Sequence, residues 1–266
     1  MSIPPPPPSD YDLQEEPEKP KRPTGWLGSL GALGLLLWKA KGLLAAVKFL
    51  PLLKSGLWMF VYMGVTAWQI GWPAAVMILA VLLLHETGHA IALKIQGRPV
   101  YALTFIPFVG AFGRQEPGKH VTQDAFVALA GPLMALPTIV LFGACFAIWP
   151  SSIWVVGILF ALIINLFALA PAPFFDGGKV VAMLSPKLWA LGLAIVMVIA
   201  WRNPIFWLIA IMSLPAIIAG WKVDVEKEPY YKVTTAQGTG YTLVYLALAL
   251  ILFGLNSGLQ AILIQK

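Results

Sequence analysis

Two histidines and a glutamate in one apolar stretch are the residues of this sequence best suited to chemistry. They lie in Leu82-Leu-Leu-His85-Glu86-Thr-Gly-His89-Ala90. In a helix, residues four apart lie on one face, so His85 and His89 could bind a single metal ion. Glu86 is the next residue round the helix, close enough to take a proton from a bound water without being a ligand. Ionisable groups are costly in an apolar segment and are usually functional, which favours a metal site over a structural polar pair.

A catalytic zinc site needs a third protein ligand. Three candidates lie in charged segments: His120, Glu226 and Glu228. Asp176 differs, because it follows a long apolar segment in Pro171-Ala-Pro-Phe-Phe-Asp-Gly-Gly178. The prolines end a helix there and the glycines permit a tight turn, which would direct the carboxylate back into a helical bundle. We therefore predict that His85, His89 and Asp176 bind one Zn²⁺ per chain, with Glu86 as the general base.

The elements that must position these residues are long apolar segments. Hydrophobic residues make up 59% of the 266 residues and charged residues only 11%, whereas soluble domains carry about 25% charged residues. The apolar segments span 55–72, 73–96, 124–149, 153–173, 188–201, 204–221 and 241–264. This pattern predicts an all-α integral membrane protein, a helical bundle of about six to seven spans. Segment 188–201 is short for a straight crossing and could instead form a broken hairpin with 204–221.

The remaining sequence completes the predicted domain organisation. Residues 1–24 are rich in proline and charge, which predicts a disordered cytoplasmic tail. Residues 25–54 are apolar but contain four lysines and two tryptophans, typical of a basic amphipathic juxtamembrane segment on an anionic lipid surface. We assign 55–187 to a catalytic membrane core and 188–266 to additional C-terminal spans.

The distribution of basic residues orients the predicted bundle. With the N-terminus inside and seven crossings, all lysines and arginines except Arg202 and Lys266 lie on the inner side. The positive-inside rule then predicts a multi-pass protein of the cell membrane with a cytoplasmic N-terminus. The net charge of +6 is accounted for by these flanking residues, so it does not indicate binding to nucleic acid. The single cysteine, Cys145, cannot form a disulfide within the chain.

The motifs His85–His89 and Pro171–Gly178 together resemble the paired signature of the site-2 protease family of intramembrane zinc metalloproteases. Between them, Ala128–Leu133 (Ala-Leu-Ala-Gly-Pro-Leu) is similar to the Ala-Gly-Pro segment of that family. The resemblance covers about residues 55–187. It implies hydrolysis of membrane-protein substrates in or near their transmembrane helices. It also gives Asn165, at the position of a family asparagine, a role in steadying the substrate carbonyl or oxyanion.

Residues 99–113 are apolar, aromatic and β-branched, with Pro107 and Gly110 in the middle. At 15 residues the segment is too short and too broken to span a bilayer. In the site-2 protease family a re-entrant β-hairpin occupies this position and can pair with an unwound substrate strand. The resemblance therefore implies a short re-entrant, β-hairpin-like loop, and a loop packed against the bundle is the alternative.

Other membrane catalysts fit the sequence less well. Di-iron enzymes need several histidine boxes, and only His120 lies outside the pair. Prenyl-processing proteases take a downstream glutamate as a ligand, and the later apolar segments contain none. A rhomboid-type protease needs a suitably placed serine and histidine. The alternative from another class is a non-proteolytic metal-binding scaffold or transporter of the same fold, which would have no use for Glu86.

Overall fold

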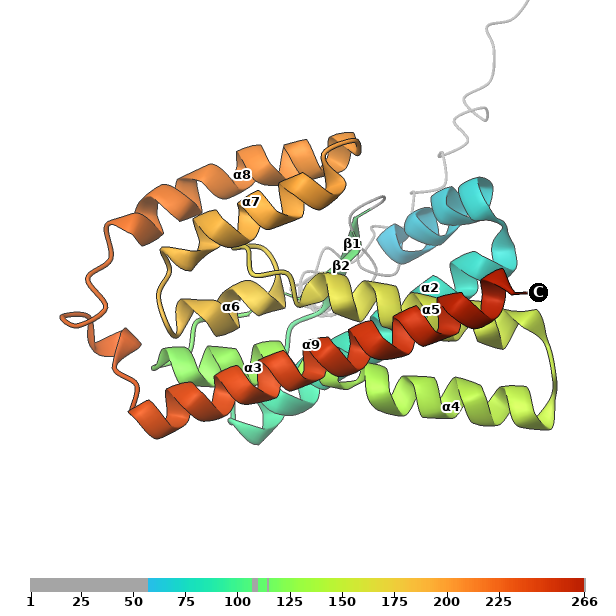
Figure 1. Ribbon diagram of the computed structural model, residues 1–266, viewed down its shortest axis with the longest axis horizontal. Coiled ribbons are helices and arrows are strands. Elements are labelled where there is room, and N and C mark those ends of the chain that lie inside the picture. Colours follow the sequence, from blue (N-terminus) through green and yellow to red (C-terminus); the bar gives the residue numbers. More distant parts are fainter. Residues whose placement is uncertain (1–56, 107–109, 114, 266) are drawn as a thin grey trace, which may run out of the picture. The chain divides into compact units, whose positions relative to one another are not determined.

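The computed structural model describes residues 57–106, 110–113 and 115–265, so the predicted tail (1–24) and juxtamembrane segment (25–54) lie outside the described residues. Helices make up most of this part of the chain (Figure 1). The first runs from Leu57 to Ile70 and is followed by α2 (Trp72–Ile95), α3 (Val121–Leu133), α4 (Ala135–Ile148), α5 (Ser152–Ala168), α6 (Asp176–Ala182), α7 (Leu188–Ala200), α8 (Pro204–Trp221) and α9 (Thr235–Ile264). A single 3₁₀ turn, Pro229–Tyr231, precedes α9.

Within the described residues, three helical stretches are long and apolar enough to cross a membrane: Trp72–Ile95, Val121–Ile148 and Thr235–Ile264. Four shorter apolar helices accompany them: Leu57–Ile70, Ser152–Ala168, Leu188–Ala200 and Phe206–Trp221. The predicted helical class is thus confirmed, and the apolar helices agree with the predicted membrane character. The number of crossings and the orientation stay predictions.

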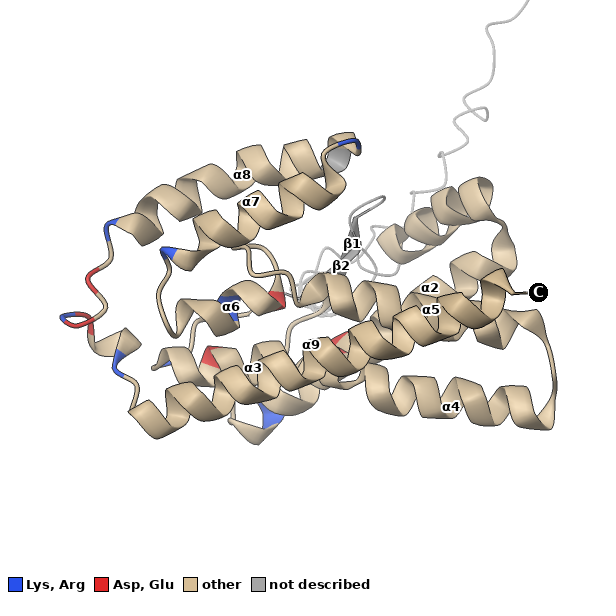
Figure 2. Cartoon of the chain, viewed as in Figure 1, with Lys and Arg blue, Asp and Glu red and all other residues tan. Residues whose placement is uncertain are grey.

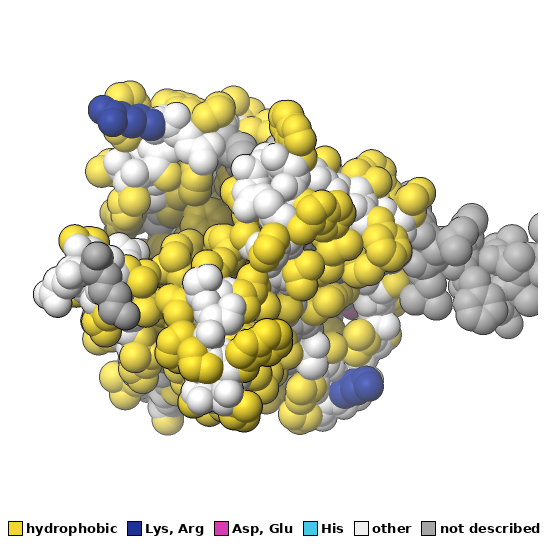
Figure 3. All heavy atoms as spheres, turned by 90° about the vertical axis from the view of Figure 1, so that its right-hand side faces the viewer, with side chains coloured by type: hydrophobic (Ala, Val, Ile, Leu, Met, Phe, Trp, Pro, Cys, Tyr) yellow, Lys and Arg dark blue, Asp and Glu magenta, His cyan; other side chains and the backbone are white. Residues whose placement is uncertain are grey.

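The surface of the bundle is suited to lipid. Only 11% of the most apolar part of α9 is buried, and large side chains such as Leu250, Phe253 and Ile262 are exposed along it. Hydrophobic side chains cover most of the face drawn in Figure 3. Charged residues lie mostly in the left half of Figure 2, whereas the right-hand ends of α4, α5 and α9 show none. Apolar surface of this extent needs a cover, which a bilayer supplies.

Helix α2 lies at the centre of the bundle, where it packs against α3, α4 and α5. Its start is set by Gly71, whose φ of 85° is readily adopted only by glycine, and by Pro73 in the first turn. Gly88 brings α2 and α3 into direct backbone contact, because a Cβ there would lie 2.2 Å from the carbonyl oxygen of Ala130. Small residues allow this close approach between membrane helices.

The main core cluster joins α3 and α5 to α9 through buried leucines and alanines, among them Ala128, Leu129, Leu162, Leu248 and Leu252. The Ala-Gly-Pro segment forms the last turns of α3. The chain then passes through Met134 into α4, so the predicted segment 124–149 is two consecutive helices with a break between them.

Two short strands, β1 (Leu103–Ile106) and β2 (Gly110–Gly113), lie between α2 and α3. They pair antiparallel, with Leu103 opposite Gly113 and Ile106 opposite Gly110. Strand pairing therefore occurs where a β-hairpin-like loop was expected, while its re-entrant position in a membrane stays a prediction.

Helices α7 and α8 lie side by side (Figure 1), joined by the short connection Trp201–Asn203. This packing matches the broken hairpin considered for segments 188–201 and 204–221. Helix α7 also packs against α6, which connects the pair to the part of the bundle that carries Asp176.

Candidate metal centre

Helix α2 supplies the two histidines and the glutamate of the candidate centre. His85, Glu86 and His89 are all buried, with 6%, 9% and 4% of their surface exposed. Burial of three ionisable side chains on one turn of an apolar helix is costly unless they have partners. The packing of α3, α5 and α6 around this turn provides partners for the two histidines.

The turn between α5 and α6 carries Asp176 to the histidines. Helix α5 ends at Ala168, and Asp176 is the first residue of α6. The chain folds back so tightly that a Cβ on Gly177 would lie 2.0 Å from the carbonyl oxygen of Leu169. A Cβ on Gly178 would lie 2.0 Å from that of Ala172. Both glycines are therefore required by close backbone contact, which agrees with the tight turn predicted from the motif.

Three potential donor atoms converge at this point. Oδ2 of Asp176 lies 3.2 Å from Nε2 of His85 and 3.1 Å from Nε2 of His89. The two Nε2 atoms are 3.0 Å apart. In the part of the chain that the structure describes, this is the one group of three or more such side chains able to hold a metal ion.

Hydrogen bonds at the Nδ1 atoms of His85 and His89 fix the tautomers of both imidazole rings. Nδ1 of His85 lies 2.7 Å from Oδ1 of Asn165, and Nδ1 of His89 lies 2.7 Å from the carbonyl oxygen of Val127. The Asn165 amide is itself oriented, because its Nδ2 donates to the carbonyl of Ala161 at 2.8 Å. Each Nδ1 therefore faces an acceptor and carries the ring proton.

With neutral rings, the two Nε2 lone pairs and a carboxylate oxygen then face one another at about 3 Å, an arrangement that a bound cation would stabilise. Tetrahedral zinc, with bonds of about 2.0–2.1 Å, separates its ligands by roughly 3.3 Å. The donor set therefore fits zinc in both chemistry and size.

Gly131 of α3 leaves the space that the imidazoles occupy. A Cβ at this position would lie 2.4 Å from Nε2 of His89 and 2.8 Å from Cε1 of His85. One turn earlier, Val127 provides the carbonyl that holds His89. The Ala-Gly-Pro segment thus bounds the metal centre, a role that its motif did not reveal.

Glu86 lies beside a small cavity next to the metal-donor atoms. It lines a cavity of about 20 Å³ together with His89, Tyr101, Leu103 and Gln115. That volume accommodates one water molecule. No hydrogen bond from another described residue holds the Glu86 carboxylate, so it can accept a proton from a molecule in the cavity.

Asn165 has a different neighbour from the one expected. It is 1% exposed, and its side chain contacts His85 and the backbone of Ala161. In the structure its amide oxygen contacts His85, and the role at the substrate that the family resemblance implies stays a prediction. The sequence carries no signal for this contact, because the two residues are 80 positions apart on different helices.

The other candidate ligands are not part of the group. His120 is exposed at the N-cap of α3, and Glu226 and Glu228 are exposed in the connection between α8 and α9. Among the described residues, none of the three joins a metal-binding group.

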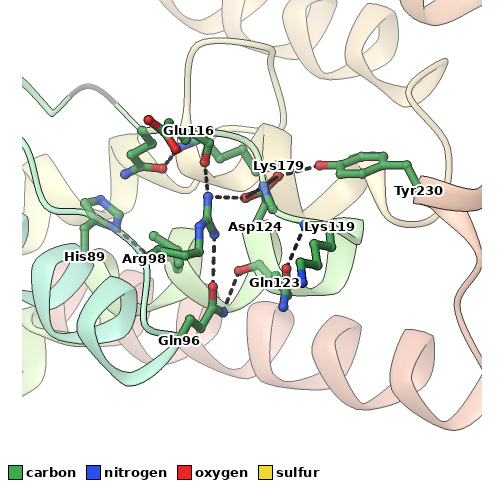
Figure 4. A network of polar contacts seen from close by, with 12 residues as sticks. His89, Gln96, Arg98, Glu116, Lys119, Gln123, Asp124, Lys179 and Tyr230 are labelled. Atoms are coloured by element: carbon green, nitrogen blue, oxygen red, sulfur yellow. Dashed lines mark hydrogen bonds and ion pairs between the residues drawn. The ribbon is translucent and has the colours of Figure 1, made fainter.

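A polar network beside the centre was not predicted (Figure 4). Asp124 accepts hydrogen bonds from the hydroxyl of Tyr230 at 2.6 Å and from the backbone of Gly118 at 2.9 Å, and pairs with Arg98 at 2.9 Å. Arg98 also donates to the backbone of Glu116. Burial and the bond to Asp124 raise the pKa of Tyr230 above its ordinary value. The network joins the loop after α2, the start of α3 and the connection before α9.

Known proteins similar to this chain are named as zinc metalloproteases. "Putative zinc metalloprotease Rip3" of Mycobacterium tuberculosis is 32% identical over 129 residues, which is 45% of this chain and 33% of that protein. "Putative zinc metalloprotease sll0528" of Synechocystis sp. is 29% identical over 122 residues, or 44% of this chain and 32% of that protein. The match thus spans about a third of the length of these curated relatives. No protein-family profile matches the chain.

Proposed function

We propose that this chain is an intramembrane zinc metalloprotease of the site-2 protease kind, which hydrolyses peptide bonds in or near transmembrane segments of membrane proteins. One observation carries the proposal: three metal-donor atoms meet beside a glutamate that lines a cavity sized for one water molecule. The names of the similar proteins support zinc and proteolysis. The paired sequence motifs support the site-2 protease kind.

His85, His89 and Asp176 would hold the zinc ion, and Asn165 and Val127 would hold the two imidazoles in the tautomer that exposes Nε2. When bound, zinc polarises a carbonyl oxygen and lowers the pKa of a water molecule toward about 7. Glu86 accepts the proton of the attacking water and passes it to the leaving amine nitrogen. A buried carboxylate that no other described residue holds by a hydrogen bond is suited to that transfer.

The depth of the centre supports cleavage within the membrane. His85 follows Trp72, the first residue of α2, by about 20 Å at ~1.5 Å per residue. The hydrocarbon core of a bilayer is about 30 Å thick, so the centre lies past the midplane. With a cytoplasmic N-terminus, that is the inner half, and substrates are cut toward their cytoplasmic side.

The β1–β2 ladder supplies a means of presenting the substrate. Intrahelical hydrogen bonds hide the carbonyls of a transmembrane helix, so the scissile segment must unwind. A two-stranded ladder offers an edge on which an extended segment can be held by main-chain hydrogen bonds. Leu103 of β1 lines the same cavity as Glu86, which supports this arrangement.

The competing function is a metal-binding scaffold or transporter of the same fold. Glu86 argues for hydrolysis, because a carboxylate beside the ligands but outside the ligand set adds nothing to a structural metal site. A scaffold would also need no cavity next to that carboxylate.

The test is cleavage of a model transmembrane peptide by the purified chain in liposomes, with the metal content of each variant measured in parallel. Wild type should cleave the peptide and contain zinc. Glu86→Gln should retain zinc and lose cleavage, because Glu86 transfers a proton and does not bind metal. Cleavage by Glu86→Gln at more than a few per cent of wild type would overturn the role of Glu86.

The same experiment tests the ligand set. Asp176→Ala should lose zinc after mild chelation, whereas His120→Ala, the matched control, should keep it. Loss of zinc from His120→Ala but not from Asp176→Ala would contradict the proposed centre.

A further inference from the structure

The carboxylate of Asp176 has two different environments. Its Oδ2 faces the imidazoles of His85 and His89, at 3.2 and 3.1 Å. Its Oδ1 lies 3.7 Å from Nζ of Lys179, one turn further along α6. The Asp176 side chain is 12% exposed and the Lys179 side chain 36% exposed, so the carboxylate end of the pair is the shielded one. The ion pair therefore lies partly shielded from water, on the side of the carboxylate away from the histidines.

Lys179 is held from a second direction. Its Nζ donates a 2.9 Å hydrogen bond to Oε1 of Gln115, which is 64 residues earlier in the chain. Gln115 follows β2, which ends at Gly113, and lines the cavity with Glu86 and His89. Lys179 thus connects the segment after the β ladder to the carboxylate in the metal centre, beside the network of Figure 4.

We propose that Lys179 is a positioning residue of the metal centre, which holds Oδ1 of Asp176 so that Oδ2 alone faces the metal, and that Gln115 keeps Lys179 in this position. The proposal rests on the proposed function, since it requires a metal beside Asp176. Partners of a ligand that do not touch the metal commonly set the ligand's orientation and affinity. An ammonium group on one oxygen opposes rotation of the carboxylate into a two-oxygen mode.

An ordinary salt bridge between residues three apart on a helix is the competing explanation. Exposed pairs of that kind contribute little. Two observations separate Lys179 from them: the burial of Asp176, and the hydrogen bond to Gln115 from a different element. A lysine that only solvated α6 would need neither.

The experiment uses the full chain in detergent, stripped of metal and titrated with Co²⁺ and Zn²⁺. The visible absorption of bound Co²⁺ reports coordination geometry, and competition with a chelator gives the affinity for Zn²⁺. Lys179→Met should weaken Zn²⁺ binding by about tenfold or more and change the Co²⁺ spectrum. Lys179→Arg keeps a cation and should recover most of both.

Two further variants make the test specific. Gln115→Ala removes the hydrogen-bond partner of Lys179 and should shift both readouts in the same direction as Lys179→Met, by a smaller amount. It also keeps the test decisive where Lys179→Met fails to fold. Lys187→Met removes an exposed lysine beyond the end of α6 and should match wild type.

The proposal is overturned by a Lys179→Met variant with wild-type affinity and spectrum, or by a Lys179→Arg variant as defective as Lys179→Met. His85→Ala distinguishes failure of the role of Lys179 from failure of the metal centre as a whole. A Co²⁺ spectrum that His85→Ala abolishes and Lys179→Met leaves unchanged rejects the role of Lys179 alone. A Co²⁺ spectrum that His85→Ala leaves unchanged rejects the metal centre itself.

Discussion

Nδ1 of His85 on α2 lies 2.7 Å from Oδ1 of Asn165 on α5, and the backbone of Ala161 fixes the orientation of the amide. This contact decides which nitrogen of His85 is left to bind a metal. The partner of Nδ1 of His85 is the buried amide of Asn165 and not water, so a residue on α5 sets the tautomer of a residue on α2. The packing of these two helices is therefore part of the metal chemistry.

Asn165→Ala should lower the affinity for Zn²⁺ by about tenfold or more, because His85 loses the acceptor that orients it. The measurement is chelator competition on the purified variant. Thr138→Val is the matched control, since it removes another buried polar group, one bonded only to the backbone of its own helix. An Asn165→Ala variant with wild-type zinc affinity but a reduced kcat would instead support contact with the substrate.

Gly131→Ala should disrupt the centre without replacing any ligand. The added Cβ would lie 2.4 Å from Nε2 of His89, and overpacking of this kind costs about 1–3 kcal/mol. Zinc affinity should therefore fall by roughly tenfold to a hundredfold. Gly143→Ala on α4 is the control, because its Cβ would meet nothing within 4 Å. Equal zinc affinity for the two variants would contradict the prediction and would show that α3 can shift enough to accommodate a Cβ at position 131.

Tyr230→Phe should lower thermal stability, because Asp124 loses a hydrogen bond at the point where the α8–α9 connection meets α3. A bond to a charged acceptor contributes about 1.5 kcal/mol or more, which corresponds to a fall in Tm of roughly 3–6 °C in detergent. Tyr231→Phe is the neighbouring control and should change Tm less. An unchanged Tm for Tyr230→Phe would show that the hydrogen bond from Tyr230 to Asp124 does not stabilise the folded protein.

The same pair of residues gives a pH dependence. The pKa of Tyr230 is raised above its ordinary value of 10.0, so the folded state favours the protonated hydroxyl. Its contribution is complete below pH 10 and is lost as the pH rises through the higher folded-state pKa. The difference in Tm between wild type and Tyr230→Phe should therefore be constant at neutral pH and shrink above pH 10.

Single cysteines in a Cys145→Ala background should report the orientation in the membrane. Lys119→Cys and Lys227→Cys lie at exposed positions flanking α3 and in the α8–α9 connection, and both should react with impermeant reagents from the cytoplasmic side. Ser152→Cys, exposed at the start of α5, should react only from the opposite side. The reverse pattern would contradict the cytoplasmic N-terminus.

The features that could be anticipated from the sequence are those encoded locally. The apolar segments predicted helices because each is continuous, and the spacing of His85 and His89 places them on one face of α2. The prolines and glycines around Asp176 predicted its turn, because they act on the backbone of their own segment. The partners of these residues could not be anticipated, because Asn165 and Lys179 act through contacts 64 to 80 residues away. The break at Met134 was missed because the whole segment is apolar, although Pro132 and Pro137, residues that interrupt helices, lie on either side of it.

The backbone contact between Gly88 and Ala130 has a mechanical consequence. With no side chain between them, α2 and α3 cannot slide or separate without losing that contact, so they behave as one rigid block that carries both histidines. Helix α8, in contrast, packs mainly against α7, and that pair is joined to the block through α6. Displacement of the α7–α8 pair would leave the spacing of the two histidines on α2 unaltered. It would disturb the turn before Asp176, because a Cβ on Gly192 of α7 would lie 1.8 Å from the carbonyl oxygen of Pro171.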